Sequence, residues 1–320
     1  MKNCFIVLNG KISNKILIRY SKMFRGILSV ILFYCFFSLL NPTVYAGAWT
    51  LKRGQLWIKS SVFYQKTDKR YYSRNQPCPL IDCRKGQQVP FPFNGESRVT
   101  AVYWDINYGL TDQIELDLQI PFFDISFKDD PNPLRPKTSS VGDIRFGARY
   151  RFISKPIVST IGVAAKAPTG LFNKDAEFVP IGDGQWDFEI QGQFGRSLWP
   201  LPGYVNVDIG YRFRFEPDIE TSDLDPGNEF YFRGEAGYNI RRNILIKAAL
   251  DGFWGERFTN RGTHLKFIDS ERNILYFEPG IYWMFLAPWA AEASVKFSLS
   301  GKNYPSGQIF GFGLSYMFSL

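Results

Sequence analysis

The chain has 320 residues, of which 45% are hydrophobic and 17% aromatic, and a formal net charge of +8 at pH 7. Six of its 38 basic residues and none of its 30 acidic residues precede residue 47, so the rest of the chain is close to neutral. A near-neutral chain lacks the broad basic surface that nucleic-acid binding requires, and we expect no nucleic acid among its partners. The sequence also has no phosphate-binding glycine loop, metal-ligand cluster or dinucleotide fingerprint, so we expect no cofactor and no metal.

Residues 1–46 have the features of a signal peptide. The apolar run Gly26–Leu40 is preceded by basic residues and followed by a small-x-small pattern at residues 44–46. Cleavage after this pattern would leave Gly47 as the mature terminus. Met23 is an alternative start, because the segment that follows it still has the length of a signal peptide. An amino-terminal membrane anchor is the other interpretation, but the apolar run is shorter than the roughly 20 residues of a spanning helix.

Many stretches of about ten residues alternate apolar with polar side chains. The pattern is clearest in residues 113–122, 141–152 and 204–215. Because successive side chains of a strand point to opposite faces, each stretch predicts a strand with one apolar and one polar face. A soluble β-sandwich with its apolar faces turned inward would show the same alternation.

The connections between these stretches favour a membrane barrel. Short turns and longer polar loops alternate strictly, as they do in bacterial outer-membrane barrels. We therefore expect residues 47–320 to form one domain, a 12-stranded antiparallel transmembrane β-barrel of the bacterial outer membrane, with a long first external loop near residues 67–96. The even strand number places both termini in the periplasm. The expected strands are residues 55–66, 97–108, 113–126, 141–152, 157–168, 185–199, 204–215, 228–239, 244–257, 273–285, 290–299 and 309–320.

Two cysteines, Cys78 and Cys83, lie in the first long loop. An exported protein enters an oxidising compartment, where two cysteines five residues apart in a proline-containing loop are expected to form a local disulfide. A metal site would need more ligands than these, and the only histidine, His264, is distant in the sequence.

Several motifs carry a family resemblance. Residues 141–152 (VGDIRFGARYRF), 165–170 (AKAPTG), 109–112 (GLTD) and 207–213 (VDIGYRF) resemble the corresponding segments of the outer-membrane β-barrel family labelled for the meta pathway of phenol degradation. The likeness spans roughly residues 97–320. It implies a small, transporter-like barrel of the outer membrane.

This resemblance implies three kinds of partner, namely outer-membrane lipids, a small-molecule permeant and the barrel assembly machinery. Such barrels commonly end on an aromatic residue that assists their assembly. Here Tyr316 and Phe318 keep the aromatic pattern, and Ser319 and Leu320 follow them.

The charged residues on the inward faces are the candidate functional residues, because the side chains that line a pore decide what passes through it. They include both acids and bases, so they could form ion pairs that brace the wall, a charged constriction that selects permeants, or both. The candidate lumen-lining residues are Glu115, Asp117, Arg145, Arg149, Arg151, Asp187, Glu189, Arg212, Arg214 and Arg233.

Two pairings of these residues follow from the simplest antiparallel registers. The third and fourth strands would place Asp117 opposite Arg149 and Glu115 opposite Arg151. The hairpin around residue 200 would bring the acids at positions 187 and 189 near the arginines at positions 212 and 214.

The sequence thus predicts an outer-membrane channel or transporter for the passive passage of small polar or amphipathic solutes, aromatic ones included. The alternative is a structural or surface-interaction barrel that acts through its external loops. A membrane lipid hydrolase would need an activated nucleophile beside a base. His264 has no matching serine and acid motif around it, so we expect no enzyme.

Overall fold

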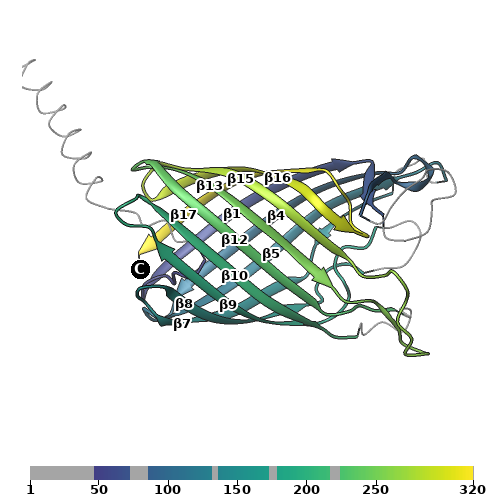
Figure 1. The fold of residues 1–320 in the computed structure, drawn as a ribbon, viewed down its shortest axis with the longest axis horizontal. Coiled ribbons are helices and arrows are strands. Elements are labelled where there is room, and N and C mark those ends of the chain that lie inside the picture. Colours follow the sequence, from purple (N-terminus) through teal and green to yellow (C-terminus); the bar gives the residue numbers. More distant parts are fainter. Residues whose placement is uncertain (1–46, 73–85, 132–135, 173–178, 217–223, 320) are drawn as a thin grey trace, which may run out of the picture. The chain divides into compact units, whose positions relative to one another are not determined.

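Twelve antiparallel strands of a single sheet close into a barrel (Figure 1). Strand β1 pairs with β17 on one side and with β4 on the other, which closes the ring and confirms the predicted fold class and strand number. The computed structural model describes residues 47–72, 86–131, 136–172, 179–216 and 224–319. The barrel strands are β1 (Gln55–Thr67), β4 (Glu96–Gly109), β5 (Ile114–Lys128), β7 (Ile144–Ile153), β8 (Val158–Ala167), β9 (Asp187–Ser197), β10 (Gly203–Arg214), β12 (Glu229–Arg241), β13 (Ile244–Gly255), β15 (Asn273–Leu286), β16 (Trp289–Lys302) and β17 (Gln308–Ser319).

The alternation of side chains explains why the sheet closes in this way. Every second residue of a strand points outward, and most of the outward residues are large and apolar. The exposed fraction is 40 to 44% for Ile190 and Phe194 on β9 and for Val207 and Ile209 on β10. An apolar surface this extensive is stable in lipid, where a closed barrel also pairs every strand edge. The outward face is therefore the lipid-facing surface of the protein.

The connections divide the barrel into two ends. We call the end with the tight connections at residues 110–113, 154–157, 198–202, 242–243 and 287–288 the short-turn end, and the opposite end the long-loop end. Two of the exposed tryptophans, Trp199 and Trp283, lie close to the short-turn end, and Trp186 and Trp254 lie close to the other. Exposed indole rings at both ends form the two aromatic girdles that are typical of transmembrane barrels.

The pairing of β5 with its neighbour is interrupted at Gly142 and Asp143. An additional strand, β6 (Lys137–Val141), pairs with the long-loop part of β5, and β7 pairs with the remaining part. The predicted strand 141–152 therefore starts at Ile144. Asp143 accepts hydrogen bonds from the backbone N–H groups of Gly170 (2.9 Å) and Asp183 (2.9 Å), so the chain that follows β8 packs against the break.

The remaining elements are short and lie at the long-loop end. β2 (Lys69–Tyr71) pairs with β3 (Gln88–Pro90), β11 (Leu224–Asp225) pairs with β14 (Thr259–Asn260), and residues Pro92–Asn94 form a 3-10 turn. Among the described residues, no helix is long and apolar enough to cross a bilayer. The predicted signal peptide, residues 1–46, and the predicted Cys78–Cys83 disulfide lie outside the described residues.

Candidate functional site

The lumen is lined on one side by a chain of ion pairs that runs from strand to strand. Glu189 on β9 is only 3% exposed and accepts hydrogen bonds from two arginines, Arg145 on β7 (2.9 Å) and Arg212 on β10 (2.8 Å). Arg145 also donates to Asp117 on β5 (2.9 Å), and Arg212 donates to Glu229 on β12 (2.6 Å). A buried carboxylate is costly unless it is paired, and here each arginine joins carboxylates of two different strands.

One of the two predicted registers is correct. β9 and β10 pair Glu189 with Arg212 and Asp187 with Arg214, as the hairpin predicts. Arg214 also lies near Glu229 (3.2 Å), so the pairing extends to the next strand.

The register predicted between the third and fourth strands was wrong by two residues. β5 and β7 place Glu115 opposite Arg149, and the two side chains form an ion pair. Asp117 lies opposite Gly147 and takes Arg145 as its partner instead. The simplest register failed because a long connection joins these strands and the break at Gly142 shifts their pairing, whereas β9 and β10 share a tight turn.

Arg151 does not join these ion pairs. Its guanidinium donates to the backbone carbonyl of Asp112 (2.6 Å) at the short-turn end. We call the chain of ion pairs from β5 to β12 the charged wall. The predicted site residue Arg151 lies at the rim of the barrel and is not part of this wall.

A second group of charges continues around the ring. Arg233 on β12 contacts Glu235 (2.8 Å) and Glu278 (2.8 Å), and Lys247 contacts Glu292 (2.6 Å). The other inward charges of this group are Asp251, Lys296 and Lys59. The alternation in the sequence predicts that Glu278, Glu292 and Lys247 point inward, and their ion pairs agree with this. The sequence did not indicate that Lys59 points inward, because serines interrupt the alternation of apolar residues in β1.

A compact polar cluster lies at the long-loop end of the charged wall. Lys166 contacts Asp143 (3.2 Å), Asp183 (2.6 Å) and Asp187 (2.8 Å), and Arg214 contacts Asp183 (3.0 Å). Burial raises the pKa of the Asp183 carboxyl, but Arg214 and Lys166 outweigh that effect and hold it well below its usual range. Asp183 therefore stays ionised at neutral pH and ties the loop before β9 to the wall.

The long-loop part of β1, β4 and β5 carries aromatic rings on its inner face, and we call this part the aromatic wall. Tyr103 on β4 packs edge to face against Phe63 on β1 and against Phe123 on β5, with 5.8 Å between ring centroids in both pairs. These three side chains are half-buried. Edge-to-face contacts of this kind stabilise an aromatic cluster beyond the area that it buries. The lumen thus presents an aromatic cluster as well as ion pairs.

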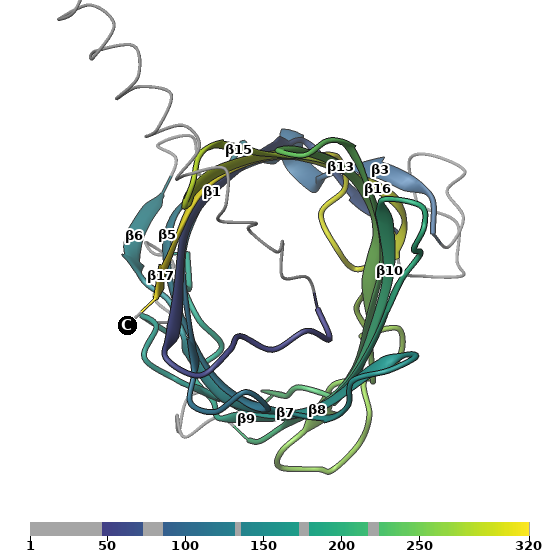
Figure 2. The ribbon, with the colours of Figure 1, turned by 90° about the vertical axis from the view of Figure 1, so that its left-hand side faces the viewer.

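The amino-terminal segment, residues 47–54, enters the lumen at the short-turn end, and Figure 2 shows its dark purple trace inside the ring. The backbone of Ala48 is held on both sides: its N–H donates to Asn206 (2.9 Å) and its carbonyl accepts from Thr160 (2.6 Å). The N–H of Leu51 donates to Glu115 (2.7 Å). The segment therefore spans from β1 to the charged wall and narrows the opening.

Glycine at position 195 makes room for this segment. A Cβ atom at Gly195 would lie 2.5 Å from the ring of Trp49. The Trp49 ring in turn packs edge to face on Tyr204, with 6.1 Å between centroids. The indole can lie against the wall because residue 195 has no side chain.

The long-loop end of the lumen is narrowed by Tyr304, in the connection between β16 and β17. This connection reaches into the ring in Figure 2. The backbone carbonyl of Tyr304 accepts a hydrogen bond from the N–H of Tyr71 (2.9 Å). The Tyr304 ring packs on Phe253, with 5.5 Å between the ring centroids. Tyr71, Ile274 and Tyr276 form a small buried apolar cluster beside it. Both ends of the lumen are thus partly covered by the chain itself.

The described part of the chain contains no group of three or more His, Cys, Asp or Glu side chains arranged to hold a metal ion. Most acids of the lumen pair with arginine or lysine side chains, and Asp105 accepts a hydrogen bond from Gln119 (2.7 Å). His264 lies exposed in the connection between β13 and β15.

The closed, twelve-stranded sheet with an apolar outer face and a charged lumen defines the chain as a barrel of the outer-membrane type. In fold it is similar to the crystal structure of an outer membrane channel from Pseudomonas putida F1, with a TM-score of 0.69 and 20% sequence identity over 86% of this chain and 100% of that one. The translocator domain of the autotransporter NalP from Neisseria meningitidis matches with a TM-score of 0.45 and 11% identity over 93% of this chain and 96% of that one. A CymD monoaromatic hydrocarbon channel matches with a TM-score of 0.44 and 8% identity over 84% and 89%. No family model and no curated protein matches the sequence.

Proposed function

We propose that the protein is a narrow, passive outer-membrane channel for small polar or amphipathic solutes, including aromatic ones. The observation that carries this proposal is a lumen that presents both ion pairs and a cluster of aromatic rings. The ion pairs around Glu189 offer polar partners, and Tyr103 offers a ring face to an apolar group. A solute with one polar and one flat apolar part could contact both.

The two narrowed ends make the channel selective by size. Residues 47–54 cover part of the short-turn end, and Tyr304 covers part of the long-loop end. Passive diffusion through a wall of this kind requires neither a cofactor nor an energy source. The similarity in fold to an outer membrane channel is compatible with this role.

The location and processing of the chain are part of the same proposal. The protein resides in the outer membrane after cleavage behind Ala46, both of its termini lie in the periplasm, and Cys78 and Cys83 form a disulfide. The motif resemblance supports a place in the family labelled for the meta pathway of phenol degradation. Intact-mass analysis of the protein extracted from membranes tests the cleavage site and the disulfide together.

Ion selectivity in planar bilayers tests whether the charged wall lines the pore. Arg212→Ala and Arg149→Ala each remove a positive charge from the lumen and leave carboxylates behind, so we expect the channel to shift toward cations. Ile120→Val on the lipid-facing side of β5 should leave the selectivity unchanged. Unchanged reversal potentials in both arginine variants would show that ions do not pass along this wall.

A surface-interaction barrel is the second candidate, because segments of the chain cover both ends of the lumen. In that case the folded protein conducts no ions, and variants of the long loops, rather than of the lumen, change its activity. A heat-modifiable, correctly folded barrel without any conductance would favour this candidate over the channel.

A further inference from the structure

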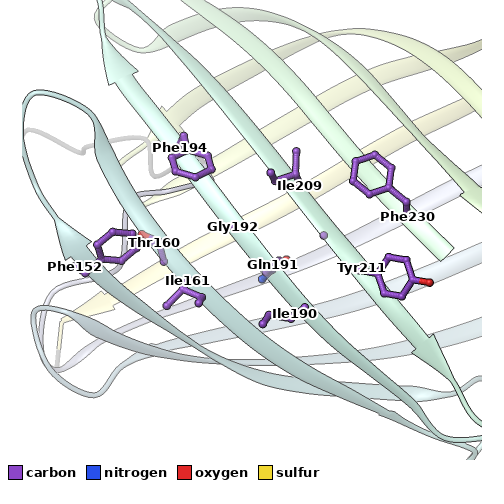
Figure 3. A pocket seen from close by; sticks show the side chains of 11 residues that line it. Phe152, Thr160, Ile161, Ile190, Gln191, Gly192, Phe194, Ile209, Tyr211 and Phe230 are labelled. Atoms are coloured by element: carbon purple, nitrogen blue, oxygen red, sulfur yellow. The ribbon is translucent and has the colours of Figure 1, made fainter. Parts of the chain in front are cut away.

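The two faces of the barrel wall offer a ligand different contacts. On the lipid-facing side, a hollow over β8, β9 and β10 is lined mainly by apolar side chains such as Ile190, Phe194 and Ile209 (Figure 3). On the inner side, Tyr103 and Asp105 are two residues apart on β4, so both side chains point into the lumen. A ring and a carboxylate on one face can bind a ligand that is both flat and positively charged.

No base of the protein neutralises the carboxylate of Asp105. It accepts a hydrogen bond from the uncharged amide of Gln119 on β5 (2.7 Å), and within the described part of the chain it forms no ion pair. Lys59 is the neighbour of Asp105 on β1, but its ammonium lies 2.7 Å from Glu292 on β16. The stem of Lys59 crosses β17, because its Cε atom lies 2.8 Å from the position of a Cβ atom at Gly313. Lys59 therefore points away from β4.

The ion pairs to which Lys59 belongs are balanced without Asp105. Four bases and four acids form one connected group, so their charges cancel. The members of this group are Lys59, Arg233, Lys247, Lys296, Glu235, Asp251, Glu278 and Glu292. On the other side of Asp105, Arg145 and Arg149 contact the acids of the charged wall. The negative charge of Asp105 is thus available to a positively charged ligand.

The rings of the aromatic wall have no cation either. Phe63, Tyr103 and Phe123 are half-buried, so part of each ring is accessible from the lumen. Elsewhere among the described residues, an arginine or lysine lies 5.2 to 5.7 Å from the centroid of three other rings, but none lies over a ring of this wall. The face of an aromatic ring attracts cations, because the ring quadrupole makes it electrostatically negative.

We propose that Asp105 and the aromatic wall form a binding site for an aromatic ammonium ion, a flat ring that carries a primary amine on a short aliphatic arm. The ammonium donates hydrogen bonds to the Asp105 carboxylate, and the ring of the ligand packs on Tyr103 and Phe123. Two residues of a strand span about 7 Å, so one small molecule can contact both Asp105 and Tyr103. The site rests on the proposed function, because it lies in the lumen, and it names the class of solute that this part of the lumen binds.

Ligand binding to the refolded full barrel in detergent micelles tests the site without requiring any solute to pass through. The probes are benzylammonium, benzyl alcohol, which has the same size but no charge, and ethylammonium, which has no ring. Titrations followed by saturation-transfer NMR give the Kd of each probe. We expect the Kd of benzylammonium to be about tenfold lower than that of either other probe, because only benzylammonium makes both the charge-assisted hydrogen bond and the ring contact.

Asp105→Asn removes the charge and keeps an oxygen that can accept the hydrogen bond from Gln119. This variant should raise the Kd of benzylammonium about tenfold and leave the Kd of benzyl alcohol unchanged. Benzoate can place its ring on the same wall only with its carboxylate turned away from Asp105, so it should bind the variant at least as well as the wild type. Asp124→Asn is the matched control, because it removes a carboxylate that pairs with Lys137 at the surface, and it should bind every probe like the wild type.

Equal Kd values of benzylammonium and benzyl alcohol in the wild type would overturn the proposal, and this comparison depends on no variant. A preference for benzylammonium that persists in Asp105→Asn would also overturn it. Preferential binding by a folded barrel that carries no ion current would support the site and contradict the proposed channel. An ion current without preferential binding would contradict the site alone, so the two proposals fail separately.

Discussion

The charged wall and the aromatic wall are both built from strands whose side chains alternate between inward and outward. The two walls differ in the chemistry of their inner faces. On the charged wall, Glu189 and Arg212 alternate with outward apolar residues. On the aromatic wall, β5 turns Phe123 inward while Phe122 points outward, so both faces of this part of the strand are apolar. The comparison shows that a barrel needs an apolar outer face but leaves its inner face free to vary. The inner face is therefore where function can be encoded.

The largest effect is expected where the amino-terminal segment meets the charged wall. Gly195→Phe places a ring where Trp49 now lies, and the clash should displace residues 47–54 from the lumen. We expect single-channel conductance to rise severalfold in planar bilayers. Gly234→Phe, which adds the same ring on the lipid side, should leave the conductance unchanged. An unaltered conductance in Gly195→Phe would show that the segment does not restrict the passage.

Removal of the central carboxylate of the charged wall should destabilise the barrel. Glu189→Gln leaves Arg145 and Arg212 without their shared partner, at a cost of about 3 kcal/mol in the free energy of unfolding. Urea unfolding in lipid vesicles measures this loss. Asp124→Asn is the control, because Asp124 is 37% exposed and its ion pair with Lys137 at the surface should contribute less than about 1 kcal/mol. Equal stability of the two variants would mean that the inner ion pairs do not brace the wall.

The aromatic wall should influence the binding of solutes in the lumen rather than the stability of the barrel. Phe123→Leu removes one ring from the cluster, and we expect an aromatic solute such as benzoate to block the ion current less well. A ring contact contributes about 1 kcal/mol, which corresponds to a roughly fivefold weaker block. Phe122→Leu, on the lipid side of the same strand, is the matched control and should behave as the wild type. An equally strong block by benzoate in both variants would show that the aromatic wall does not bind the solute.

The smallest effect concerns the polar cluster around Asp183. The depressed pKa of this carboxyl means that its contribution to stability is complete above its unfolded-state pKa of about 3.9 and is lost as the pH falls below that value. The difference in unfolding free energy between the wild type and Asp183→Asn should therefore be constant from pH 7 to about pH 5 and shrink below pH 4. A difference that grows on acidification would contradict this assignment.

The sequence predicted all twelve strands to within three residues, because each presents a strong apolar row to lipid. It predicted the β9–β10 ion pairs, because a tight turn fixes that register. The pairing of Glu115 with Arg149 was missed, since a break and a long loop separate β5 from β7. The aromatic wall was also missed in part: in residues 120–123 both faces are apolar, so alternation gives no sign of which residues point inward.

The contacts that residues 47–54 make inside the lumen could not be predicted from the sequence either. These residues show no alternation, and their contacts with Asn206 and Thr160 join positions more than a hundred residues apart. Such long-range contacts follow only once the barrel has closed. From the sequence we expect residues 47–53 at the periplasmic mouth of the barrel, but the sequence does not reveal the partners of this segment.

Single-channel recording of the wild-type protein with a matched pair of solutes tests the central claim most directly. If solutes pass between the charged and the aromatic wall, the folded barrel should show a small ion current that benzoate interrupts and acetate does not, because only benzoate carries a ring. A folded barrel without current, or a current that both solutes affect equally, would contradict the account.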